Sequence, residues 1–80
     1  MTYTINETIN SYRIDISGDI KKTNKLADFI DDSANFSAVE TRIKHREKES
    51  YIIVDPVKKR DLMAKTLLDA LVQVFIKKNE

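Results

Sequence analysis

Apolar and polar residues alternate near the start of the chain, between residues 11 and 17. Tyr12, Ile14 and Ile16 fall on one side of this segment, and charged or hydroxyl side chains fall on the other. Because successive side chains of a strand point to opposite faces, the pattern predicts a β-strand with one buried face. The threonine-rich residues 2–8 precede it and leave two interpretations open, a short edge strand or a frayed arm.

The same alternation appears twice in the middle of the chain and predicts a β-hairpin. Residues 39–46 alternate, residues 47–50 are polar and suit a turn, and residues 51–54 are rich in β-branched and aromatic side chains. A turn at this place puts Arg46 opposite Tyr51. The face that we expect to contact the helices carries Ile43, His45, Ile52 and Val54.

Apolar residues spaced by three or four positions predict two helices. The first begins between residues 19 and 24, ends near Ser33 and has a single apolar stripe. For the second, Asp55 is a suitable N-cap and Pro56 a suitable first residue, so we expect the helix to run from there to about Lys77. A helix of roughly 20 residues is about 30 Å long.

The order of these elements predicts an α+β fold. A β-α-β-β-α order gives a small two-layer domain in which two helices, the C-terminal one long, cover one face of a three-stranded sheet. Residues 2–8 are a candidate fourth strand at the N-terminal edge, and the 80 residues form a single domain, 1–80. The chain has no cysteine and no signal-peptide pattern, and its apolar stretch 62–76 is shorter than the roughly 20 residues that span a bilayer. We therefore expect a cytoplasmic protein without a membrane partner.

The segment from residue 62 to 76 is apolar on most of its circumference. Its polar positions form one thin stripe, made of Lys65, Thr66, Asp69 and Gln73. A surface helix normally has one apolar face, so this helix must be covered on more than one side, and a chain of this length has little material for that. One interpretation is that the sheet and the first helix cover it completely. The other, which we favour, is a homodimer that self-associates through Ala64, Leu68, Val72 and Ile76.

The second face of the predicted hairpin is basic and is a candidate partner-binding site. This basic hairpin face consists of Arg42, Lys44, Arg46, Tyr51 and Ile53. Three cations at every second position beside an aromatic ring could grip an acidic protein surface, or could hold phosphates while Tyr51 stacks on a base. A third interpretation is a solvated face in which Arg42 pairs with Asp55 or Glu40.

Lys58, Lys59 and Arg60 fall in the expected first turn of the second helix, where free backbone N–H groups attract anions. These cations form a candidate anion site. The interpretation that we favour is that the acidic residues 28, 31 and 32 of the first helix pair with them, or that Asp55 and Asp61 screen their charge. The single histidine has no second histidine or cysteine to complete a metal site, so the sequence predicts neither a metal nor a cofactor.

The sequence contains no nucleophile with an adjacent base and no glycine-rich phosphate loop, which argues against an enzyme. A net charge of +1 argues against binding to nucleic acid through the molecule as a whole. We therefore predict a non-enzymatic protein-interaction module. Scarce glycine and proline beside many lysines, isoleucines and asparagines suggest an AT-rich genome, and hence a phage or bacterial regulator or inhibitor that docks on a larger protein. The alternative is a nucleic-acid-binding protein that uses the basic hairpin face.

Overall fold

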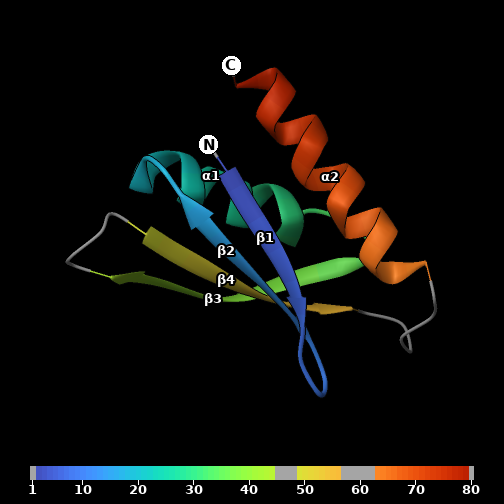
Figure 1. Ribbon diagram of the computed structural model, residues 1–80. Coiled ribbons are helices and arrows are strands. Elements are labelled where there is room, and N and C mark those ends of the chain that lie inside the picture. Colours follow the sequence, from blue (N-terminus) through green and yellow to red (C-terminus); the bar gives the residue numbers. More distant parts are fainter. Residues whose placement is uncertain (1, 45–48, 57–62, 80) are drawn as a thin grey trace.

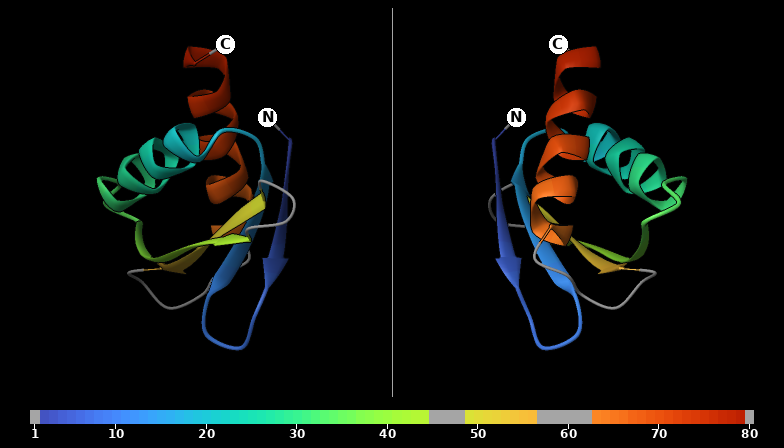
Figure 2. Two further views of the ribbon diagram at one scale, coloured as in Figure 1. Left: turned by 90° about the vertical axis from the view of Figure 1, so that its left-hand side faces the viewer. Right: turned by 90° about the vertical axis from the view of Figure 1, so that its right-hand side faces the viewer.

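The computed structural model describes residues 2–44, 49–56 and 63–79. Its elements are β1 (Thr2–Glu7), β2 (Tyr12–Ser17), α1 (Ile20–Asp31), β3 (Phe36–Lys44), β4 (Glu49–Pro56) and α2 (Ala64–Lys78). The strands form one antiparallel sheet in the order β1-β2-β4-β3, and both helices lie on the same face of it (Figures 1 and 2). The predicted α+β fold is confirmed, and residues 2–7 are the fourth strand.

The hairpin of β1 and β2 follows the predicted alternation. Tyr12, Ile14 and Ile16 of β2 are all buried beneath the helices. β1 pairs with β2 along its whole length, from Thr2 opposite Ser17 onward. β1 is therefore an edge strand of the sheet and not a frayed arm.

The hairpin of β3 and β4 has a different register from the one predicted. Tyr51 lies opposite Arg42, four residues earlier in the chain than the expected Arg46. β4 extends as far as Pro56, which lies opposite Phe36, and this longer pairing buries Phe36. From Glu40 onward the shift is an even number of residues, so each side chain of that stretch keeps its face. Ile52 and Val54 are accordingly buried against the helices, whereas His45 and Arg46 lie outside the described residues.

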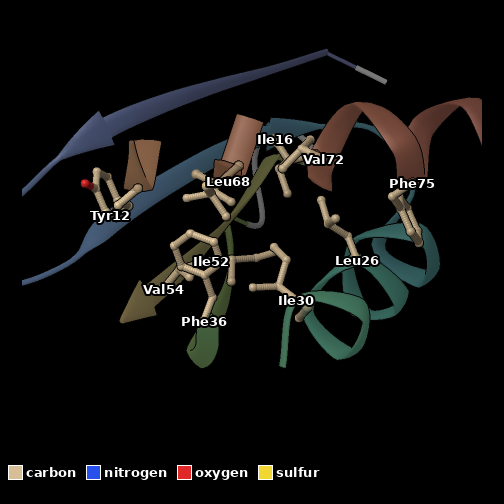
Figure 3. Close-up of a cluster of buried hydrophobic side chains, with 13 residues drawn as sticks. Tyr12, Ile16, Leu26, Ile30, Phe36, Ile52, Val54, Leu68, Val72 and Phe75 are labelled. Carbon is tan, nitrogen blue, oxygen red and sulfur yellow. The ribbon is translucent and has the colours of Figure 1, made fainter. Parts of the chain in front are cut away.

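Helix α1 begins and ends within the predicted limits. Asp19 is its N-cap, and its carboxylate accepts a hydrogen bond of 2.9 Å from the backbone N–H of Lys21. Its buried face includes Leu26 and Ile30, which point toward the sheet (Figure 3).

Helix α2 is shorter than predicted, because Asp55 and Pro56 do not start it. Both residues belong to β4, where they lie opposite Ser37 and Phe36. Proline has no backbone N–H, but at the end of a strand this costs no hydrogen bond of the ladder, so β4 accommodates Pro56. The preference of proline for the first position of a helix therefore gave a wrong prediction here. The described helix of 15 residues is about 22 Å long. Residues 58–60, the candidate anion site, lie outside the described residues.

One apolar core lies between the sheet and the two helices. Leu68 and Val72 of α2 point into it together with Ile16 of β2 and Ile52 of β4 (Figure 3). The two helices also contact each other. Their aromatic rings Phe29 and Phe75 lie with centroids 5.8 Å apart. A buried polar contact accompanies the core, since the Ser50 hydroxyl donates to Thr23 Oγ1 over 3.0 Å.

Candidate functional site

The stripe predicted for self-association lies inside the domain, so this prediction is wrong. Leu68 and Val72 are 0% exposed, and Ala64 is buried beside them. Ile76 is half-buried and packs against the same core. These side chains already contact the sheet and the first helix, and they are not accessible to a second copy of the folded domain.

A different stripe of α2 faces outward. We call Met63, Leu67, Ala70 and Val74 the exposed stripe. Met63 is 60% exposed, Leu67 45% and Val74 44%. Its members are spaced by four, three and four residues, so they form one continuous line along the helix.

The error has a geometric cause. Successive helix residues are rotated by about 100° around the helix axis. Viewed along that axis, α2 has two apolar stripes, and the two lie at similar angles on either side of the direction opposite the polar residues. Periodicity alone does not say which of the two faces the sheet. Two contacts decide it in the structure. Phe75 meets Phe29 of α1, and Asp69 accepts a hydrogen bond from the Tyr3 hydroxyl of β1.

The contact between Tyr3 and Asp69 also perturbs an ionisable group. Burial of the Tyr3 hydroxyl, and then its hydrogen bond to the Asp69 carboxylate, raise the pKa of Tyr3 above its ordinary value of 10.0. Gln73 donates a further hydrogen bond of 3.1 Å to the same carboxylate. The polar stripe of α2 is therefore anchored to the edge strand β1.

No described helix or strand covers the face of the sheet opposite the helices, which we call the open face (Figure 2). An arginine–tyrosine stack lies at its centre, on the middle strands β2 and β4. The Arg13 guanidinium lies 4.2 Å from the centre of the Tyr51 ring, across from β2 to β4. Asp15 holds the arginine in this position, with Nε and a terminal nitrogen at 3.0 and 2.9 Å from the same carboxylate oxygen. Asn6 of β1 donates to the other oxygen of Asp15 over 3.1 Å. Three strands thus fix one guanidinium on an aromatic ring.

The basic hairpin face is only partly basic once its neighbours are included. Arg42 and Ile53 share the open face with Tyr51, as predicted from the alternation. Arg42 forms an ion pair of 2.6 Å with Glu40, one of the two carboxylates considered from the sequence. The side chain of Lys44 and all of Arg46 lie outside what the structure describes. The described arginines of this face are therefore neutralised locally by carboxylates.

A hollow of about 430 Å³ lies beside the stack, over the adjoining ends of β1, β2 and β4. Its lining includes the acidic Asp15 and Glu49 and the hydroxyl-bearing Thr4, Ser17 and Tyr51. From the sequence, Arg13 of the first predicted strand was a candidate neighbour of the basic hairpin face, whereas no pattern pointed to Asp15 or to the residues of β1. The alternation of residues 11–17 already put Arg13 and Asp15 on the outer side, but only the strand order shows that β2 lies next to β4.

Within the described parts of the chain, no group of three or more histidine, cysteine, aspartate or glutamate side chains is arranged to hold a metal ion. No helix of these parts is long and apolar enough to cross a membrane. Comparisons with protein-family models, with curated proteins and with solved structures give no match.

Proposed function

We propose that this domain is a non-enzymatic module that binds another protein through the open face of its sheet. The observation that carries the proposal is the Arg13–Tyr51 stack beside the hollow. Tyrosine and arginine are among the residue types that contribute most often to the binding energy of protein interfaces. A guanidinium that is already held in place loses little conformational freedom when a partner docks, which favours binding.

The charge pattern of this face favours a protein over a nucleic acid. Arg13 is paired with Asp15, and Arg42 is paired with Glu40. A phosphate backbone would have to compete with these carboxylates, and binding to nucleic acid depends on cations that are free to replace counterions. A protein surface with charges of both signs can match such a pattern without breaking the pairs.

The hollow indicates which side chain the partner would present. Asp15 and Glu49 provide carboxylates, and Tyr51 provides a phenol side chain. A lysine or arginine of the partner suits these groups, and an apolar neighbour of that residue would contact Ile53 on the same face. We further propose that the domain acts as a regulator or inhibitor, of phage or bacterial origin, by occupying a larger protein in this way.

The experiment is a peptide selection with matched variants. A displayed library of random peptides is selected on the wild-type domain, and the enriched peptides are then measured on Tyr51→Ala, on Glu49→Gln and on Thr66→Ala. Thr66→Ala is the control, because Thr66 is exposed on α2, which covers the opposite face of the sheet. We expect enriched peptides to contain lysine or arginine beside an apolar residue and to lose affinity about tenfold or more on the first two variants only.

A second arm tests the nucleic-acid alternative. Light scattering measures the molar mass of the domain with a pool of short single- and double-stranded nucleic acids at low salt. A mass increase that disappears at moderate salt would replace the proposal with phosphate binding. Peptides whose affinity is unchanged on Tyr51→Ala and Glu49→Gln would remove the open face as the docking site.

A further inference from the structure

The two edges of the sheet are protected to different degrees. The β3 edge is interrupted by a register shift between Ala38 and Glu40, and it carries the charged residues Glu40 and Arg42. Bulges and charges are the usual means of preventing an edge strand from pairing with another chain. β1 has neither a bulge, a proline nor a lysine, and it pairs with β2 in an unbroken register. In both views of Figure 2 it lies at the margin of the sheet.

The hydrogen-bond phase of β1 shows which backbone groups face outward. The N–H of Thr8 donates to the carbonyl of Ser11 over 2.9 Å, so this pair closes the turn as a hydrogen-bonded pair. Hydrogen-bonded and non-hydrogen-bonded pairs alternate along an antiparallel ladder. Thr4 is therefore bonded to β2, whereas the backbone N–H and C=O groups of Tyr3 and Ile5 point away from the sheet.

We propose that β1 pairs with β1 of a second copy, antiparallel, about a two-fold axis that passes beside Thr4. In this register Tyr3 exchanges two backbone hydrogen bonds with Ile5 of the partner subunit, and Ile5 does the same with the partner's Tyr3. The two four-stranded sheets become one continuous sheet with the helices of both copies on one face. The inference is independent of the partner-binding function proposed above.

Side-chain complementarity selects this register and this occupant. Tyr3 and Ile5 are half-buried on the helix-covered face, so the register places an aromatic ring beside a β-branched side chain twice. Thr4 is exposed on the open face and meets the partner's Thr4 across the axis. Aromatic–β-branched pairs and threonine pairs are among the cross-strand pairs that stabilise sheets. No like charges meet among these residues, and the Tyr3 hydroxyl bond to Asp69 holds the edge in place.

The symmetry of the arrangement limits it to a dimer. A two-fold contact uses the same edge on both copies, so no second β1 edge is left over. The remaining edges belong to β3, which carries the register shift and the charges. We therefore expect a weak dimer that forms with rising concentration and does not grow into a fibre.

The test places charges on the axis. Sedimentation equilibrium is measured over a range of concentrations for the wild-type chain, for Thr4→Lys, for Thr4→Glu and for an equal mixture of these two variants. Each variant alone should dimerise about fivefold more weakly than wild type at low salt, because like charges then lie opposite each other. The mixture should form a heterodimer at least as tight as the wild-type dimer. Thr2→Lys is the control, since Thr2 lies opposite Asn6 of the partner subunit, and it should leave the dimer unchanged.

Three outcomes would overturn the proposal. The first is a wild-type chain that stays monomeric at every concentration. The second is a dimer whose strength is the same in Thr4→Lys and in wild type. The third is a mixture of the lysine and glutamate variants that gains nothing over either variant alone, which would place the two-fold axis elsewhere. Circular dichroism confirms that every variant is folded before its mass is interpreted.

Discussion

Truncation of neighbouring leucines of α2 should have very different effects on stability. Leu68 is 0% exposed, whereas Leu67, about 100° away around the helix axis, is 45% exposed. Leu68→Ala removes three buried carbon atoms, which is about 2.4 kcal/mol of transfer free energy. The cavity left among close-packed neighbours adds to this, so we expect a loss of about 3 kcal/mol. Leu67→Ala loses about half of the transfer term, leaves no enclosed cavity and gains helix propensity, so its cost should be below about 1 kcal/mol.

Thermal and urea unfolding, followed by circular dichroism, measure both variants. An 80-residue domain has a free energy of unfolding of about 4–12 kcal/mol, so Leu68→Ala should still fold, with Tm lower by about 15 °C. Leu67→Ala should lower Tm by no more than about 5 °C. Equal losses for the two variants, or a larger loss for Leu67→Ala, would mean that α2 is rotated and that our assignment of the exposed stripe is wrong.

Two further predictions concern single contacts. Asp19→Ala removes the N-cap of α1 and should cost about 1 kcal/mol in urea unfolding, whereas Asp19→Asn keeps an acceptor and should cost less. The pKa of Tyr3 is raised in the folded state, so Tyr3 stabilises the fold as long as its hydroxyl is protonated. This contribution to the free energy of unfolding is complete below pH 10.0 and is lost as the pH rises through the folded pKa. Tyr3→Phe should weaken this alkaline loss in unfolding measured against pH, and an unchanged pH dependence would contradict the role of the Asp69 contact.

The strands and the first helix could be predicted from the sequence because their signals are local. The alternation of Tyr12, Ile14 and Ile16 needs no knowledge of neighbouring strands, and the acceptor side chain of Asp19 identifies a helix start by itself. The end of β4 was not predictable in this way. Asp55 and Pro56 carry a helix-start signal, and only their pairing with β3, which is not local, keeps them in a strand.

The candidate site shows the same division. Parity along the hairpin put Arg42 and Tyr51 on one face, and this holds even though the register was wrong by four residues. The stack of Arg13 on Tyr51 depends on β2 lying beside β4, which no pattern in the chain indicates. The face of α2 was ambiguous for a similar reason, since two apolar stripes fit the periodicity equally well and contacts from β1 and α1 choose between them.

The strand order also determines how this chain can fold. β1 with β2, and β3 with β4, are neighbours in the sequence and can each form from nearby residues. The seam, which is the pairing of β2 with β4, is different. Ile14 lies opposite Ile52, although α1 and β3 separate the two residues in the sequence. Closing such a long loop costs entropy before any contact compensates for it, so we expect the seam to set the folding rate. The central strands, which are the most buried part of the finished sheet, are then the last to be joined.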